Sequence, residues 1–268
     1  MKPAEQSPDA IAAITDPGEV GRAEHNKGDR FVITVGNVFA WLFPILMIAI
    51  CAQVVLRGMG HNQAWLDDLQ WWLYGAAAMI GIAYAVTTNS HVRVDIFYDN
   101  FPRRKQTVYD IIGLVWLFLP FIMISWDVTL GYGLSSFFTD EGSSSPNGLH
   151  NLWILKLFVN AAFVLVAIAV WSAYVRALSR LTRPALWKQM LFAFPSTVFA
   201  VNLAIYYALV GWVMMTDPEA DNMRKALRAP VFDDFKVGPY DILYTVVAAF
   251  VIAVLLIVLS RVFARKEG

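Results

Sequence analysis

The stretch Gln70–Thr88, QWWLYGAAAMIGIAYAVTT, decides the fold of this chain because it contains no charged residue over 19 positions. As an α-helix rising ~1.5 Å per residue it would extend about 28 Å, close to the roughly 30 Å thickness of the hydrocarbon core of a bilayer. Two aspartates, Asp67 and Asp68, precede it, and a basic segment that begins at Arg93 follows it. Since basic residues collect on the cytoplasmic side of membranes, the sequence predicts a membrane crossing whose basic end lies inside.

The composition extends this prediction to the whole chain. Hydrophobic residues make up 58% of the 268 residues and charged residues only 16%, whereas soluble domains carry about 25% charged residues. The chain contains no nucleophile–base pair, zinc-ligand pattern or phosphate-binding glycine loop, so the sequence gives no support to an enzyme. The single cysteine, Cys51, cannot form an intramolecular disulfide and is expected to fill a buried position.

Six apolar segments predict an all-α polytopic membrane protein. They are Ile33–Leu56, Gln70–Thr88, Thr107–Leu134, Leu152–Leu178, Leu191–Met215 and Tyr240–Leu259. Residues 1–30 are polar and lack the apolar core of a signal peptide, so we expect a disordered cytoplasmic tail. Pro120, inside the third segment, is expected to kink it.

The distribution of basic residues predicts that both termini lie in the cytoplasm. With this topology, 15 of the 21 Lys and Arg residues fall on the inner side, and the inverted topology would leave only the other six there. The fifteen are Lys2, Arg22, Lys27, Arg30, Arg93, Arg103, Arg104, Lys105, Arg176, Arg180, Arg183, Lys188, Arg261, Arg265 and Lys266.

Two short amphipathic segments are expected to lie in the membrane interface. In Trp65–Trp72 the apolar residues have helical spacing and the aspartates avoid their face, so Trp65, Trp71 and Trp72 would set the depth at the periplasmic side. Residues 93–101 form the second segment, on the cytoplasmic side. There Arg93, Arg103 and Arg104 would hold the chain to anionic phospholipid headgroups.

Two ionisable residues fall inside the crossings. Asp127 in the third segment and Lys156 in the fourth have similar predicted depths on consecutive antiparallel helices, which predicts a structural ion pair. The alternative is that Lys156 extends alone to the outer interface.

Two other classes of membrane protein stay open as alternatives. A membrane anchor of a redox enzyme would hold haem between helical histidines, but His25, His61, His91 and His150 all fall outside the crossings. A self-sufficient small carrier would be expected to contain paired helices broken by Gly or Pro, and no such pair is present.

Several short motifs, in this order along the chain, resemble those of one protein family. They are Gln53-Val-Val-Leu-Arg57, Trp65-Leu-Asp-Asp-Leu69, His91-Val-Arg-Val-Asp95, Phe101-Pro-Arg-Arg104 and Asp140-Glu-Gly-Ser143. From Ile45 to about Leu178 the chain resembles the small membrane subunit of tripartite ATP-independent periplasmic (TRAP) transporters, the DctQ-like proteins. The family's acidic pair is more often two glutamates, where this chain has Asp67-Asp68.

The resemblance implies a non-enzymatic subunit of the bacterial inner membrane that braces a large transport subunit. A periplasmic binding protein would deliver the substrate, usually an organic acid anion. Sodium would bind the large subunit, so this chain is expected to hold no cofactor or metal, and no nucleic acid is expected as a partner. The resemblance also implies a four-helix domain over residues 31–183, which leaves 184–268 as an additional two-helix hairpin of unknown purpose.

The candidate contact residues follow from these motifs. Those expected at an interface or a partner are Arg57, Trp65, Asp67, Asp68, Trp71, Trp72, His91, Arg93, Asp95, Arg103, Arg104, Asp140 and Glu141. For Asp67, Asp68, Asp140 and Glu141, a loop exposed to solvent is as good an interpretation as a docking surface.

Overall fold

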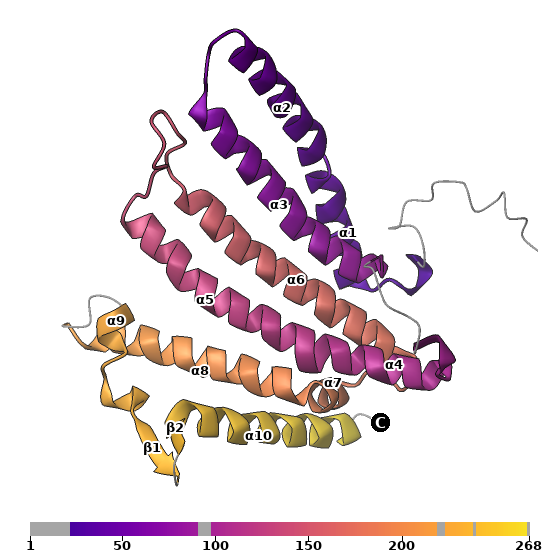
Figure 1. Ribbon diagram of the computed structural model, residues 1–268. Coiled ribbons are helices and arrows are strands. Elements are labelled where there is room, and N and C mark those ends of the chain that lie inside the picture. Colours follow the sequence, from indigo (N-terminus) through magenta and orange to yellow (C-terminus); the bar gives the residue numbers. More distant parts are fainter. Residues whose placement is uncertain (1–21, 91–97, 219–222, 238–239, 267–268) are drawn as a thin grey trace, which may run out of the picture. The chain divides into compact units, whose positions relative to one another are not determined.

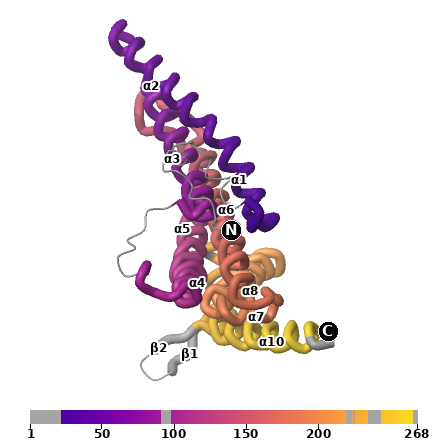
Figure 2. Tube along the Cα trace, turned by 90° about the vertical axis from the view of Figure 1, so that its right-hand side faces the viewer, coloured from indigo at the N-terminus to yellow at the C-terminus, as the bar shows by residue number. Residues whose placement is uncertain are grey.

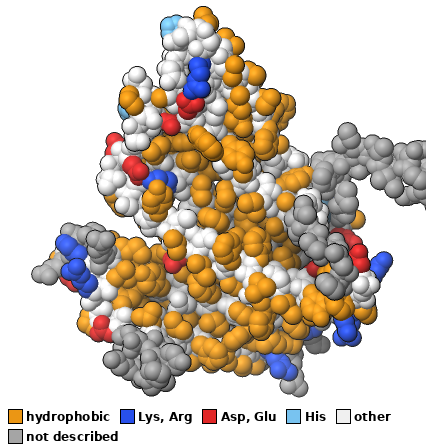
Figure 3. Space-filling model, in the orientation of Figure 1, with side chains coloured by type: hydrophobic (Ala, Val, Ile, Leu, Met, Phe, Trp, Pro, Cys, Tyr) orange, Lys and Arg blue, Asp and Glu red, His pale blue; other side chains and the backbone are white. Residues whose placement is uncertain are grey.

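The computed structural model describes residues 22–90, 98–218, 223–237 and 240–266. Six helical stretches of this described part are long and apolar enough to cross a membrane, which confirms the predicted polytopic helical fold (Figure 1). They are Lys27–Gly58, Ala64–Thr88, Arg103–Phe138, Trp153–Ser179, Phe194–Thr216 and Tyr244–Ala264. On the face shown in Figure 3, hydrophobic side chains cover the helix shafts, and most Lys, Arg, Asp and Glu side chains gather near helix ends.

Contacts divide the chain into two compact units. Unit 1 consists of Met1–Val94 and Thr129–Arg176, and unit 2 of Asp95–Val128 and Ala177–Gly268. The boundary between the units passes through two of the helices. Each of these two helices therefore has one end in unit 1 and the other end in unit 2.

Unit 1 is built on four helices and one end of a fifth. They are α1 (Lys27–Phe39), α2 (Leu42–Gly58), α3 (Ala64–Thr88), the later part of α5 (Leu119–Phe138) and most of α6 (Trp153–Ser179). Helices α1 and α2 both pack against α3. A break at Ala40–Trp41 separates α1 from α2 and places Pro44 in the first turn of α2, where a missing N–H costs no helical hydrogen bond.

The first interfacial helix predicted from sequence does not exist as a separate element. Residues Trp65–Trp72 are the first two turns of α3, which continues without a break to Thr88. At ~1.5 Å per residue its 25 residues make about 38 Å. That exceeds the bilayer core of roughly 30 Å, so the first turns still reach the interface although they belong to the crossing itself. Asn89 ends α3 at φ 58°, a left-handed conformation that asparagine tolerates.

Two further parts of the prediction concern the N-terminal tail and the second interfacial segment. Within the tail predicted to be disordered, Arg22–Glu24 forms a 3-10 turn and α1 already begins at Lys27. The second interfacial segment, residues 93–101, lies mainly outside the described residues, and only its Tyr98–Asn100 turn is seen.

Unit 2 contains the first part of the third span and the whole C-terminal region. The third span begins with α4 (Arg103–Ile112) and the π-helical η4 (Gly113–Phe118). The C-terminal helices are α7 (Leu186–Phe192), α8 (Phe194–Thr216), the short α9 (Met223–Ala226) and α10 (Tyr244–Lys266). Helix α10 packs against both α8 and α7, and α7 lies beside α10 in both views (Figures 1 and 2).

A small antiparallel hairpin precedes α10 and was not predicted. Strands β1 (Asp234–Val237) and β2 (Tyr240–Leu243) pair with Val237 opposite Tyr240. The sixth helix therefore begins at Tyr244 and not at Tyr240. The short 3-10 turn η5 (Pro230–Phe232) leads into this hairpin.

The third span is irregular directly before Pro120, the residue expected to disturb it. Through η4 the backbone bonds in the π pattern, with the N–H of Leu119 donating to the carbonyl of Leu114. In that pattern the carbonyl of Val115 would accept from residue 120, but proline has no N–H. The hydroxyl of Ser196 in α8 donates to this carbonyl instead. The indole N–H of Trp116 also donates to the carbonyl of Phe192, at 2.8 Å, so two side-chain bonds join the span to the C-terminal helices.

Candidate functional site

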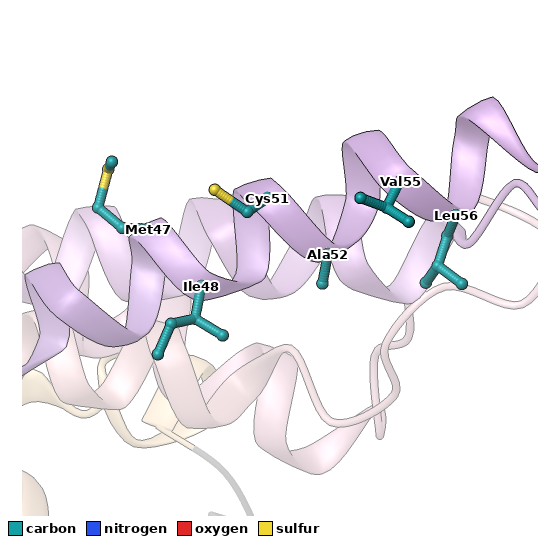
Figure 4. Close-up of a pocket in the computed structure, with 6 residues that line it drawn as sticks. All are labelled: Met47, Ile48, Cys51, Ala52, Val55 and Leu56. Carbon is teal, nitrogen blue, oxygen red and sulfur yellow. The ribbon is translucent and has the colours of Figure 1, made fainter.

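Helix α2 presents most of its apolar side chains outward from unit 1. Only Ala49 and Gln53 are buried along it, while Met47, Ile48 and Val55 are each more than 60% exposed. A shallow groove on this face is lined by α2 alone (Figure 4): Met47, Ile48, Cys51, Ala52, Val55 and Leu56. Cys51 is exposed there, so the expectation that it fills a buried position is wrong. Such a continuous apolar face requires lipid or another protein against it.

A polar cluster joins α2 to α3 near the ends that the charge pattern assigns to the periplasm. Gln53 is buried, and its amide donates to the carboxylate of Asp67 while its carbonyl accepts from the amide of Gln70. Nη2 of Arg57 lies 3.9 Å from the other oxygen of Asp67, with the two side chains 66% and 46% exposed. The exposed ion pair contributes little because water screens it, so the buried Gln53 amide is the main polar link between the helices.

Asp68 is bonded within the chain. Its Oδ2 accepts from the backbone N–H of Leu149, at 2.9 Å, and so ties α3 to the loop between α5 and α6. The loop passes so close that a Cβ at Gly148 would lie 2.4 Å from the Ser143 hydroxyl and 2.7 Å from Asp68 Oδ2. Asp68 therefore has a structural contact, whatever further contact it makes with a partner.

The predicted ion pair between Asp127 and Lys156 is wrong, because each side chain has a different partner. Lys156 Nζ lies 2.5 Å from Glu141 Oε2 and 3.8 Å from the centre of the Tyr132 ring. The hydrogen bond from Lys156 lowers the pKa of the Glu141 carboxyl below its usual value. Lys156 thus pairs with the loop that precedes its helix, whereas the alternative interpretation had it extend alone to the outer interface.

The ion pair was predicted wrongly because the two residues lie at different depths along their helices. Helix α5 continues to Phe138, four residues beyond the predicted end, so Asp127 lies 11 residues inside that end, roughly 16 Å. Lys156 is the fourth residue of α6, only about 5 Å inside. Asp127 instead accepts a 2.5 Å hydrogen bond from the hydroxyl of Tyr207 in α8, which links the third span to the added helices of unit 2.

A second polar cluster of unit 1 joins the start of α1 to the ends of α3 and α6. Asp29 is fully buried, and its Oδ2 lies 2.8 Å from Nη1 of Arg176. Arg176 also donates from Nη2 to the carbonyl of Thr87, at 2.8 Å. Asn26 caps α1 through a reciprocal pair of bonds with Asp29 and donates to the carbonyl of Ser172 at 2.9 Å.

His25 is the other buried member of this cluster, at 7% exposed. Burial lowers the pKa of its imidazole, and the positive charge of Arg176 lowers it further. This cluster was not predicted, because residues 1–30 were expected to form a disordered tail. The available signal was Asn26-Lys-Gly-Asp29 directly before an apolar helix, which is the pattern of a capping box.

The remaining candidate residues are on the surface or outside the described part. Arg103 and Arg104 start α4 and are exposed, as are Trp65, Trp71 and Asp140, while Trp72 is partly buried. His91, Arg93 and Asp95 lie outside the described residues. Contact of any of these residues with a partner stays a prediction. Within the described ranges, no group of three or more His, Cys, Asp and Glu side chains is arranged to hold a metal ion.

Six apolar helices whose charged groups concentrate near their ends define a multi-pass integral membrane protein. Residues 46–180 match the family of the DctQ component of tripartite ATP-independent periplasmic transporters, and the chain belongs to this family. The match begins within α2 and ends directly after α6, so α7, α8 and α10 lie beyond it. No curated protein and no solved structure matched the chain.

Proposed function

We propose that this chain is the small membrane subunit that braces the large transport subunit of a TRAP transporter in the bacterial inner membrane, with both termini in the cytoplasm. The complex would take up an organic acid anion, delivered by a periplasmic binding protein and driven by sodium. The family is a transporter component and not an enzyme family. In this proposal the chain performs no chemistry, and the sodium and substrate sites belong to the large subunit.

The observation that carries the proposal is the way the chain uses its polar side chains. In unit 1, Asp29 pairs with Arg176 and Lys156 with Glu141, and Asp68 holds a loop. In unit 2, Asp127 is bonded to Tyr207. These groups hold helices and loops together within the chain, as expected of a support and not of a solute pathway.

Helix α2 is the face we assign to the large subunit. Both α2 and α10 expose long apolar faces, but residues 46–58 of α2 lie within the family match and α10 lies beyond it. A contact common to the family is therefore expected on α2. The groove around Ala52, with its small side chain, would admit a close helix from the partner.

Purification in mild detergent with a tag on this chain tests the assembly. We expect a large polytopic membrane protein to co-elute, and a lone monodisperse species would contradict the proposal. Ala52→Phe should reduce co-elution because it fills the groove. Ala248→Phe is the matched control, since Ala248 is also exposed but lies on α10. Equal loss in both variants would reject α2 as the contact face.

Transport tests the remaining part. Vesicles containing this chain and the co-purified protein should accumulate an organic acid anion only with the binding protein and an inward sodium gradient. Uptake by this chain alone would favour the self-sufficient carrier, and haem absorbance of the purified chain would favour the redox anchor.

A further inference from the structure

A basic and aromatic cluster in unit 2 lies outside everything that the family match covers. It is formed by Trp187 and Lys188 of α7 and Arg261 of α10, two helices that pack against each other (Figures 1 and 2). Lys188 Nζ lies 5.6 Å from the centre of the Trp187 ring, and Arg261 Cζ lies 5.3 Å from it. One indole ring therefore holds two cations beside it, which restricts both long side chains.

The charges of this cluster are not neutralised within the described part of the chain. Residues 177–216 contain no Asp or Glu, and neither do residues 244–266. Lys188 Nζ donates to the hydroxyl of Thr182, at 2.5 Å, which leaves its charge in place. Among the described residues, neither Lys188 nor Arg261 forms an ion pair with a carboxylate. Within the residues that the structure describes, the cluster thus has no anionic partner.

Apolar side chains beside the two cations indicate what kind of anion fits. On α7, Leu191 and Phe192 lie three and four residues after Lys188, so they share its side of the helix, and both are more than 40% exposed. On α10, Val258 and Val254 lie three and seven residues before Arg261 and are 51% and 38% exposed. Each cation therefore heads an exposed apolar strip. A ligand that satisfies both features has an anionic head and apolar tails.

We propose that Trp187, Lys188 and Arg261 bind the phosphate headgroup of an anionic phospholipid, whose acyl chains lie along Val258, Val254 and Leu191. The indole ring, which prefers the depth of lipid headgroups, sets the position of the two cations in the interface. Lys188 and Arg261 donate to the phosphate oxygens, and Arg261 has the donor geometry for a bidentate contact. This lipid site lies on the added helices, beyond the residues that match the family.

Titration of the full-length chain in detergent, followed by native mass spectrometry, tests the site. Phosphatidylglycerol should bind with a defined stoichiometry and at lower concentration than phosphatidylcholine. Removing both charges in the Lys188→Gln/Arg261→Gln variant should weaken phosphatidylglycerol binding about 25-fold, since each basic residue near an anionic headgroup contributes about fivefold. Trp187→Leu keeps an apolar side chain but removes the ring, and should weaken binding of the same lipid.

A matched control separates this site from general electrostatic attraction. Lys105→Gln/Arg228→Gln removes two exposed cations of the same unit and should leave phosphatidylglycerol binding unchanged. Equal weakening in the two double variants would overturn the proposal, as would equal affinity for the two lipids. Inorganic phosphate that competes at the concentration of the lipid would assign the site to a free anion instead. Circular dichroism and gel filtration of each variant show whether a loss of binding reflects loss of the fold.

Discussion

Replacing Ser196 by alanine should destabilise the fold because it removes the hydrogen bond that compensates for Pro120. The carbonyl of Val115 and the hydroxyl of Ser196 are both buried, with the two residues at 0% and 1% exposed. The nearest helical donors are not available to this carbonyl. Leu119 donates to Leu114, and Pro120 has no N–H. Ser196→Ala therefore leaves a buried acceptor with neither a protein partner nor water.

The size of the effect follows from the cost of such an orphaned group. Leaving a buried acceptor without its donor costs about 1–3 kcal/mol in proteins. Hydrogen bonds between membrane helices average only about 0.6 kcal/mol, because the unfolded chain in the membrane also finds partners, with a maximum of about 1.7 kcal/mol. Since water cannot reach Val115, we expect a loss near the upper end, about 1–2 kcal/mol in the free energy of unfolding.

Unfolding by dodecyl sulfate in mixed micelles, followed by circular dichroism, measures this loss. Ser260→Ala is the control, because the carbonyl that Ser260 contacts, that of Ile257, lies within the regular helix α10 and keeps its helical donor. A double-mutant cycle with Pro120→Ala tests the cause. Alanine at 120 supplies an N–H, so Ser196→Ala should cost clearly less in that background. The same cost with and without Pro120 would refute the reasoning.

Two further predictions concern the cluster at the start of α1. Asp29→Asn keeps the cap of α1 but leaves Arg176 buried without its counter-charge, so the free energy of unfolding should fall by about 3–5 kcal/mol in the same assay. Asp140→Asn, at an exposed position, is the control, and an equal effect in both variants would contradict a buried ion pair. Because the pKa of folded His25 is lowered, the unfolded state binds more protons below pH 6.5, so stability should fall as the pH drops from 7.5 to 5.5. The slope should flatten in His25→Gln. An unchanged slope would show that His25 is not the group responsible. Glu141 does not account for this slope, because its pKa is lowered and the stability that it contributes is lost only as the pH falls below 4.5.

The number and approximate position of the spans could be read from the sequence because they depend on one averaged property. An apolar run must be long enough for the bilayer, and every backbone group within it must be bonded, so hydrophobicity alone predicts a helix there. Local irregularities do not average in this way. Pro120 predicted an irregularity in the third span. The π-helical turn also depends on Ser196, which bonds the carbonyl of Val115. These two residues are 81 positions apart, so only the folded chain shows that they are paired.

The polar contacts show the same limit more sharply. Asp127 and Lys156 were matched by their distance from predicted helix ends, and an error of four residues in the end of α5 was enough to mispair them. Asp29 was overlooked for another reason: its partner, Arg176, is distant in sequence, and the polar residues before it resemble a disordered tail. The capping-box pattern around Asp29 is present in the sequence. Such a pattern indicates where a helix begins, but it does not indicate that the carboxylate is buried.

The polar contacts of unit 1 and unit 2 lie on different helices. Two contacts of unit 1 hold the ends of α3: Asp68 bonds the loop before α6, and Arg176, paired with Asp29, bonds the carbonyl of Thr87. Those of unit 2 lie along the third span, where Ser196, Tyr207 and the carbonyl of Phe192 attach the added helices to residues 115–127. The added helices thus attach to the first part of the third span with specific bonds. A face that carries no polar group can pack against another protein or lipid without leaving a buried group unpaired, which supports the proposal that α2 contacts the large subunit.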